Sequence, residues 1–463
     1  MDSKVIGERI KNLRISKLNI SQEDFANKIG FDRTYISRLE SGQKNPTIDT
    51  LSKICEGFGI KLKDFFDFEE ENIESNNIYK DNGLNVLSLF SNIGVAEAYL
   101  KDLGFHVSVA NEIVKRRAKL YSDIYPDTKM ICGDINNEEV INDIIFESIK
   151  ANVNVIMATP PCQGMSTAGQ QLDDDERNLL ICPVVHIIKK IKPQYVFIEN
   201  VPMFFNTKIT VSNETILIPD YLEKELTQDY IVKKYIIDTK EYSVPQSRER
   251  AIILLSRKDS FQWVLPEKDK NIVTMRDAIG YLPSIDPFIK DVSVDEMLKI
   301  FPDYYKKEQQ ALSISRWNRP PRHILRQVIA MQHTPTGCTA FDNDKYYPTK
   351  DDGSRVKGYH NTYKRQNWDT PAYTVTMDNV KISSQNNVHP GRLEYVNENG
   401  ECIYSDARVL TLYELMLITS LPKDWPIPVC TSEAFIRRII GEGIPPLFVK
   451  KVFAKLKEGN NNE

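Results

Sequence analysis

Short apolar segments alternate with helical stretches between residues 84 and 257. Each segment has the length of a buried strand and is bounded by turn or polar residues. Strands and helices alternating at this spacing predict an α/β fold with a mostly parallel sheet, which binds ligands at the carboxyl ends of its strands. The expected strands are LNVLSLF, HVSVANE, MICGDI, VNVIMATPP, YVFIENV and AIILLS, with a helix expected over 95–104.

Residues 1–66 are predicted to form five short helices. Ser21 and Asp32 precede two of them as helix caps, and Gly30 and Gly42 follow the same two. A helix, a tight turn and a second helix inside a small helical domain indicate a helix-turn-helix DNA reader. A helical protein-interaction domain is the alternative.

The segment SQEDFANKIGFDRTYISRLESGQKNPTIDTLSKI closely resembles the helix-turn-helix domain of phage repressor and Cro proteins. The resemblance implies that Asp32–Glu40 is the recognition helix. The side chains that it implies face DNA are Gln22, Arg33, Thr34, Tyr35 and Arg38.

The rest of the chain divides by composition. Residues 67–83, DFEEENIESNNIYKDNG, are acidic and poor in apolar residues, which is typical of a linker. Residues 258–405 lose the strand–helix alternation and mix prolines, aromatics and both signs of charge. Helical stretches return in residues 406–463, over 407–421 and 435–457, the second interrupted at 441–446. Five parts are therefore expected, with the α/β domain spanning 84–257.

Composition excludes several classes of protein. No apolar run is long enough to span a membrane, and MDSKVIGERIKNLR lacks the apolar core of a secretory signal, so we expect a cytoplasmic protein without a membrane partner. The cysteines lie at 55, 132, 162, 182, 338, 402 and 430, without CxxC spacing, so neither a disulfide framework nor a metal site is expected. The formal net charge of −4 does not by itself indicate nucleic acid, although an average over several domains can hide a basic face.

Four short motifs stand where expected strands end, and a fifth follows them in the chain. They are FSNIG at 90–94, GDI at 133–135, PPCQ at 160–163, ENV at 199–201 and QSRER at 246–250. Over residues 84–257 and again over 370–450 the chain resembles the cytosine-5 DNA methyltransferase family. The resemblance implies a Rossmann-like S-adenosylmethionine-dependent methyltransferase fold, with a smaller target-recognition domain at 258–405, and double-stranded DNA as the substrate.

The chemistry of the reaction explains the motif around Cys162. Cytosine C5 attacks a methyl donor only after a thiolate has added at C6, which makes C5 a nucleophile. Cys162 is the only cysteine on a loop directly after an expected buried strand, behind Pro160 and Pro161, and nearby positive charge would favour its thiolate. Because the target carbon lies inside the duplex stack, the cytosine must be flipped out.

An acid and two arginines complete the expected catalytic set. Glu199 ends the next strand, where a carboxyl partly shielded from water can protonate or hydrogen-bond N3, and Asn200 would hold the loop in shape. Arg248 and Arg250 alternate on an extended segment, so both can face the site. The resemblance implies that they approach cytosine O2 and a backbone phosphate and help to hold Cys162 as a thiolate.

The cofactor residues are expected at three strand ends. The turn at 90–94 would bring backbone close to the methionine part, Glu112 would accept the ribose hydroxyls, and Asp134 the adenine amino group. Phe90 can lie against the sulfonium by cation–π attraction. The full set expected to line the S-adenosylmethionine pocket is Phe90, Ser91, Asn92, Gly94, Glu112, Ile113, Asp134, Ile135 and Pro160.

The chain also departs from the family pattern. Family members usually have glycine where Asn92 and Val95 stand, and Gly-Asn where this chain has Gly441-Glu442. Asparagine tolerates the left-handed backbone that glycine would supply, while Val95 is expected to narrow the pocket.

Further DNA contacts are expected beyond the catalytic residues. Residues 163–180 suit a loop that closes over DNA, with contacts from Gln163, Ser166 and Arg177. In the variable region, the residue types that contact phosphates and base edges are Arg316, Trp317, Arg319, Arg322, His323, Lys364 and Arg365. Arg408 matches a structural position of the family.

Two other functions are open at this stage. The same catalytic motifs occur in a branch of the family that methylates transfer RNA, and a repressor with a decayed methyltransferase part would retain the helix-turn-helix domain. Duplex DNA is favoured by that domain and by the long variable region. The resemblance further implies a bacterial, nucleoid-associated modification enzyme, whose N-terminal domain binds its own promoter. A cognate restriction endonuclease would act on the same site without direct contact.

Overall fold

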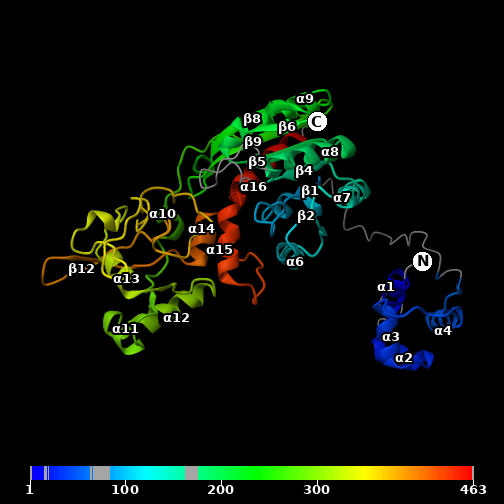
Figure 1. The fold of residues 1–463 in the computed structure, drawn as a ribbon, viewed down its shortest axis with the longest axis horizontal. Helices are drawn as coiled ribbons and strands as arrows, with labels where there is room; N and C mark the ends of the chain where they lie inside the picture. Colours follow the sequence, from blue (N-terminus) through cyan, green and yellow to red (C-terminus); the bar gives the residue numbers. More distant parts are fainter. Residues whose placement is uncertain are drawn as a thin grey trace. The chain divides into compact units, whose positions relative to one another are not determined.

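The computed structural model describes residues 3–14, 18, 20–62, 65, 84–161 and 176–460. The chain forms two compact units, residues 1–82 and 83–463, which are considered separately (Figure 1). The expected linker and most of the expected fifth helix lie outside the described residues, as do Cys162, Gln163 and Ser166.

Four of the five helices expected in the N-terminal unit lie within its described residues. They are α1 (Ser3–Leu13), α2 (Gln22–Ile29), α3 (Arg33–Glu40) and α4 (Ile48–Phe58). The Ser21 hydroxyl accepts the Asp24 N–H at the start of α2, and the Asp32 carboxylate accepts the Tyr35 N–H at the start of α3. Gly30 ends α2 at φ 73°, a conformation that glycine adopts without strain.

A small apolar core and one buried ion pair hold this unit together. Phe25 and Phe58 stack with ring centroids 4.4 Å apart inside the apolar cluster. The Arg14 guanidinium donates to both carboxylate oxygens of Glu40, at 2.7 and 2.9 Å, and Gln22 donates to the same carboxylate at 2.7 Å. The start of α2 is thereby tied to the end of the expected recognition helix.

The second unit is built on a mixed sheet, in which the described residues form seven strands in the order β3-β2-β1-β4-β5-β9-β8. The first five strands in this order are parallel to one another, while β9 is antiparallel to both β5 and β8. The strands are β1 (Asn85–Leu89), β2 (His106–Glu112), β3 (Lys129–Cys132), β4 (Val155–Ala158), β5 (Tyr195–Asn200), β8 (Tyr230–Asp238) and β9 (Glu249–Arg257). The mostly parallel α/β sheet is therefore confirmed.

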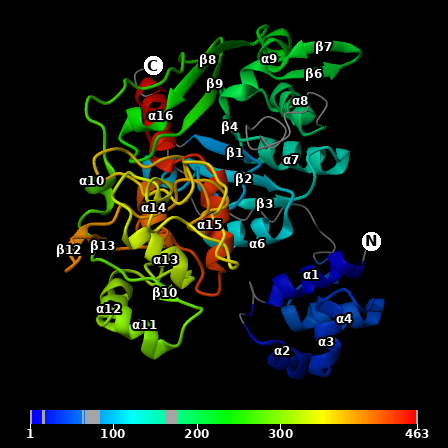
Figure 2. The same cartoon turned by 60° about the vertical axis from the view of Figure 1, so that its left-hand side comes forward.

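Helices cover both faces of this sheet (Figure 2). Alternate strand residues point to opposite faces, so Leu87 packs in the cluster that includes α7, α8 and α9, whereas Val86 packs in the cluster that includes the helix α16 (Pro446–Asn460). The elements in the catalytic part are α6 (Lys115–Ile124), α7 (Glu138–Lys150), η3 (Glu176–Leu180), α8 (Ile181–Ile191), η4 (Pro202–Asn206), β6 (Lys208–Val211), β7 (Glu214–Leu217), α9 (Ile218–Leu226) and η5 (Thr239–Tyr242).

The prediction of a helix over 95–104 is wrong. The segment forms turns and the short 3-10 segment η2 (Lys101–Leu103), closed by bonds such as Leu103 N–H to Leu100 C=O at 3.1 Å. Glu97 explains the difference, because its buried carboxyl accepts hydrogen bonds from Ser88 of β1 and Tyr121 of α6. These tertiary contacts outweigh the local helical pattern.

The variable region has a core of its own, with Met297, Val328 and Ile382 among its fully buried side chains. Its elements are α10 (Met275–Ile279), β10 (Phe288–Ile289), α11 (Val294–Ile300), α12 (Tyr304–Ile314), β11 (Arg322–His323), α13 (Leu325–Gln332), η6 (Ala340–Asp342), β12 (Leu393–Val396) and β13 (Cys402–Tyr404). The chain then forms α14 (Leu412–Ile418), α15 (Glu433–Glu442) and α16 (Pro446–Asn460), so the expected interruption separates α15 from α16. Among the described residues, no helix is long and apolar enough to cross a membrane.

Candidate active site and cofactor pocket

The turn after β1 has a tightly fixed backbone. Phe90, Asn92 and Gly94 all have positive φ, at 59°, 52° and 80°. A Cβ placed on Gly94 would lie 2.1 Å from a ring carbon of Tyr125, whose hydroxyl donates to the Gly94 carbonyl at 2.6 Å. Glycine is therefore required at position 94, both for its conformation and for space.

Glu112 ends β2 beside this turn. Its carboxylate accepts the N–H of Asn92 at 3.0 Å and that of Val114 at 2.8 Å. Burial is the largest influence on this group and raises the pKa of Glu112 above its ordinary value. The acid is thus held at the end of its strand, next to the turn, as the sequence predicted for a ribose-binding carboxylate.

The remaining residues of the expected pocket have different environments. Ile113 is 59% exposed although it is a large aliphatic residue, and Asp134 is an exposed carboxylate at the end of the neighbouring strand. Ser91 is buried and donates to the Asn111 carbonyl, while Ile135 packs in the apolar cluster under the sheet. Ile113 directly follows Glu112 in the chain, and an exposed aliphatic side chain next to a carboxylate is available to pack against a flat ligand ring.

The loop after β4 is tied to two neighbouring strands. The Asn200 side-chain amide donates to the Pro160 carbonyl at 3.0 Å, and the Thr159 hydroxyl donates to the Phe90 carbonyl at 3.2 Å. The prediction that Asn200 holds this loop is confirmed at Pro160. Cys162 itself lies outside the described residues.

Glu199 and Arg250 form an ion pair across β5 and β9. The Arg250 Nε lies 2.8 Å from Glu199 Oε1, and the two residues are 9% and 7% exposed. Arginine presents its donors in a rigid fork, so the contact fixes the orientation of the carboxylate. The expected acid and one expected arginine are therefore in direct contact, one residue from the Asn200 that holds the proline loop.

Arg248 has a contact that the sequence did not predict. Its guanidinium donates to the carbonyls of Val375, Gly441 and Glu442, at 3.1, 3.1 and 3.0 Å. Gly441 and Glu442 belong to the returning C-terminal part and Val375 to the variable region, so Arg248 joins both of them to the start of β9. The expected roles of Arg248 and Arg250 toward the cytosine stay predictions.

Sequence reasoning also missed Glu442 and Arg117 as part of this region. The Glu442 carboxylate accepts the Asn92 side-chain amide at 3.1 Å and forms an ion pair with Arg117 of α6 at 2.9 Å. The departure from the family pattern at positions 92 and 442 was the available signal. In the sequence the two positions look like separate changes, whereas in the structure Asn92 and Glu442 are hydrogen-bonded to each other.

The residues expected to contact DNA differ in exposure. In the N-terminal unit, Arg33, Thr34 and Arg38 are exposed on α3, and Tyr35 and Gln22 are half-buried. Arg177 at the start of η3 is exposed, as are Arg316, Arg319 and Arg322 of the variable region.

Two expected DNA contacts of the variable region are wrong. Arg365 is fully buried and donates to backbone carbonyls, among them those of Met331 and His389 at 2.8 Å. His323 is 3% exposed and accepts the Val409 N–H through Nε2 at 3.2 Å. Both side chains stabilise the fold of the variable region, because their polar atoms are directed inward.

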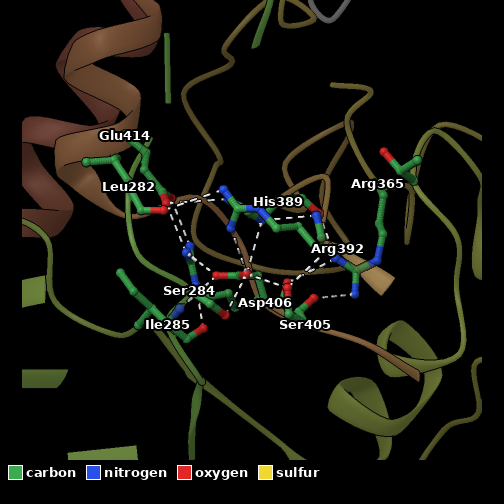
Figure 3. A network of polar contacts seen from close by, with 12 residues as sticks. Leu282, Ser284, Ile285, Arg365, His389, Arg392, Ser405, Asp406 and Glu414 are labelled. Carbon is green, nitrogen blue, oxygen red and sulfur yellow. Dashed lines mark hydrogen bonds and ion pairs between the residues drawn. The ribbon is translucent and has the colours of Figure 1, made fainter. Parts of the chain in front are cut away.

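Arg408 has the structural role that was predicted for it. Its guanidinium is fully buried and donates to Glu414 at 2.8 and 2.9 Å and to Asp406 at 2.7 Å. His389 lies between the same two carboxylates (Figure 3). The network connects the end of the variable region to α14.

Comparison with solved structures agrees with this fold. A crystal structure of a DNA modification methyltransferase encoded within an E. coli prophage matches 82% of this chain and all of its own chain, with a TM-score of 0.54 and 19% sequence identity. At this identity the match supports the fold alone, a mostly parallel sheet covered by helices.

Comparison of sequences defines the family. The model of the C-5 cytosine-specific DNA methylase family matches residues 84–458, and a helix-turn-helix family model matches residues 10–65. The Type II methyltransferase M1.HgaI of Avibacterium volantium is 42% identical over 81% of this chain and 98% of its own length. M1.HphI of Haemophilus parahaemolyticus is 24% identical over 82% of this chain and 88% of its own. The chain belongs to the C-5 cytosine-specific DNA methylase family and is a DNA cytosine-5 methyltransferase with an N-terminal helix-turn-helix domain.

Proposed function

We propose that the protein methylates carbon 5 of cytosine within a specific double-stranded DNA sequence, as the modification enzyme of a bacterial restriction–modification system. The observation that carries the proposal is the contact pair at the ends of β4 and β5. Glu199 is ion-paired with Arg250, and the adjacent Asn200 binds the Pro160 carbonyl, two residues before Cys162 in the chain. Cys162, which carries the thiol, therefore follows β4 in the chain, and Glu199, which carries the acid, lies at the end of the neighbouring strand β5.

In the proposed mechanism, the sulfur of Cys162 forms a bond to C6 of a flipped cytosine. The C5–C6 π pair then forms a C4–C5 double bond while the C4–N3 π pair moves to N3, which takes a proton from Glu199. Arg250 keeps the Glu199 carboxyl group oriented for that transfer. After C5 is methylated, N3 returns its proton to Glu199, and loss of the C5 proton to a base restores the C5–C6 double bond and releases the thiolate.

S-adenosylmethionine is the proposed cofactor and supplies the methyl group when bound. Glu112 would accept the ribose hydroxyls, Asp134 the adenine amino group, and the exposed Ile113 would pack against the base. The buried turn at 90–94 would hold the methionine part.

The reaction is tested by tritiated-methyl transfer from S-adenosylmethionine to unmethylated bacterial DNA. A Cys162→Ala variant should lose all transfer, while Cys182→Ala, a half-buried cysteine on α8, serves as the matched control and should retain it. Label recovered as 5-methylcytosine supports the proposal, and bisulfite sequencing then gives the recognition site. Label in transfer RNA instead of DNA would favour the RNA branch, and no transfer to either would favour a repressor without activity.

We further propose that the N-terminal domain binds an operator near its own gene. The exposed Arg33, Thr34 and Arg38 on α3 support this role, since a recognition helix presents such side chains to the major groove. A protein lacking residues 1–70 should methylate normally but fail to shift promoter DNA in a gel. Loss of methylation in the truncated protein would instead assign the domain to substrate recognition. A cognate endonuclease would act on the same cytoplasmic DNA without contacting this enzyme.

A further inference from the structure

The two unusual residues of the cofactor region contact each other. Asn92 stands where the family usually has glycine, and its side-chain Nδ2 donates to the Oε2 of Glu442, which stands where the family usually has asparagine. A second contact between the two motifs involves Val95, because a Cβ on Gly443 would lie 3.0 Å from Val95 Cγ1. The departures in the first motif and in the last one are therefore matched in space.

The position of Glu442 is electrostatically demanding. It is the last residue of α15, where the helix dipole disfavours a negative charge. Arg117 at 2.9 Å and Arg438 at 3.6 Å supply the compensating positive charge. The Glu442 and Arg117 side chains are only 18% and 21% exposed, so this arrangement is partly shielded from water.

Asn92 is held from two sides. Its backbone N–H donates to Glu112 at 3.0 Å, and its side-chain Nδ2 donates to Glu442 at 3.1 Å. The Oδ1 of the same side chain is buried and has no hydrogen-bond partner among the described residues. A buried carbonyl oxygen without a donor is unfavourable, so this atom is a candidate acceptor for a ligand.

A carboxylate at position 442 determines which way the Asn92 amide points. A glutamate carboxylate only accepts hydrogen bonds, so it must face the NH₂ group of Asn92 and turn Oδ1 away. An asparagine or glutamine at position 442 could donate as well as accept, and would allow both orientations of Asn92. The unusual pair thus presents an acceptor with a fixed orientation at the turn that precedes Gly94.

We propose that Glu442 is a positioning residue for the cofactor, which orients Asn92 so that its Oδ1 accepts a hydrogen bond from the α-ammonium group of S-adenosylmethionine. The inference rests on the proposed cofactor site at 90–94 and Glu112. The ammonium group is a charged donor on the methionine part, the part assigned to this turn. The adenosine part does not depend on the pair.

Two ligands separate these parts in a binding measurement. Isothermal calorimetry on the full chain with S-adenosylhomocysteine measures the whole ligand, and 5′-methylthioadenosine lacks the amino-acid group. Glu442→Gln allows the Asn92 amide to take either orientation, so it should weaken S-adenosylhomocysteine about twofold and leave 5′-methylthioadenosine unchanged. Glu433→Gln removes the same charge from the other end of α15 and should change neither.

A second variant tests whether the two residues act together. Asn92→Gly removes the acceptor without strain at φ 52° and should weaken S-adenosylhomocysteine about tenfold. Because Glu442 acts through Asn92, the double variant should bind no more weakly than Asn92→Gly alone. Thermal unfolding midpoints near that of the wild type would show that the variants remain folded.

Three results would overturn the inference. Unchanged binding of S-adenosylhomocysteine in folded Glu442→Gln would do so, as would an equal loss for 5′-methylthioadenosine, which would indicate a general change in pocket shape. Additive losses in the double variant would also contradict action through Asn92. If the wild type bound neither ligand, the proposed cofactor site itself would be wrong, which distinguishes that failure from the failure of this pair.

Discussion

Replacement of Arg408 by methionine tests what joins the variable region to α14. Arg408 is fully buried, and so are its two acidic partners, Asp406 at 1% and Glu414 at 0% exposure. Methionine fills much of the same volume but removes the positive charge and all the donors. Two buried carboxylates are then left without their arginine, which is far less favourable than leaving them in water.

The hydrogen bonds that Asp406 and Glu414 keep determine how far the free energy of unfolding falls. Asp406 keeps three donors within 2.9 Å, from Ser284, Ile285 and Ser405 (Figure 3). Glu414 loses two hydrogen bonds to the arginine and carries most of the cost. Breaking one partner out of a buried ion pair costs about 3–5 kcal/mol. We expect Arg408→Met to lower the free energy of unfolding by about 3 kcal/mol, and Arg408→Lys, which keeps the charge but not the fork, by less.

Urea unfolding followed by tryptophan fluorescence measures this loss. All 4 tryptophans lie beyond residue 83, so the signal reports only on the second unit. Arg276→Ala is the matched control, because it breaks an ion pair with Asp369 whose side chains are 60% and 73% exposed, and such pairs contribute about 0–1 kcal/mol. If Arg408→Met were no less stable than Arg276→Ala, the buried network would not hold these parts together.

Three further outcomes are expected. Burial lowers the pKa of His389 to about 4, below the 6.5 of an exposed histidine, so the unfolded chain binds this proton first. The stability that neutral His389 contributes is therefore fully present above pH 6.5 and is lost as the pH falls toward 4. His389→Gln should make the free energy of unfolding in urea depend less on pH over this range. Glu199→Gln should lower kcat for methyl transfer about 100-fold, with S-adenosylhomocysteine binding unchanged by calorimetry; an unaltered kcat would exclude Glu199 from the reaction. Gly94→Ala should lower stability by at least about 1–2 kcal/mol from left-handed strain alone, before the contact with Tyr125, and a wild-type urea midpoint would contradict this.

Local sequence signals predicted those parts of the fold that depend on neighbouring residues. The caps Ser21 and Asp32 determine where α2 and α3 begin, because a side-chain oxygen bonds an N–H three residues ahead. The strands of the catalytic sheet were equally visible, since buried parallel strands are continuous apolar runs. The acids Glu112 and Glu199 could be assigned to strand ends for the same reason.

Contacts between distant segments could not be predicted in this way. The pattern of residues 95–104 fits a helix, but the buried carboxyl of Glu97 is bonded to Ser88 and Tyr121, and the segment forms turns. The charge of Arg365 suggested a phosphate contact, whereas its donors are used by carbonyls inside the variable region. In both cases the sequence gives the chemical type of the side chain, and the tertiary structure decides its partner.

The cofactor region shows how a departure from a family pattern can carry information. Taken one at a time, Val95 narrows the pocket and Glu442 places a charge at the wrong end of a helix. In the structure Val95 packs on Gly443, where no Cβ is present, and Glu442 is paired with Arg117 and bonded to Asn92. Changes that compensate each other in space argue for a working pocket, because random loss of function would have no reason to preserve such contacts. The same contacts can be tested, because a change of either Asn92 or Glu442 alone should weaken the binding of the methionine part of the cofactor.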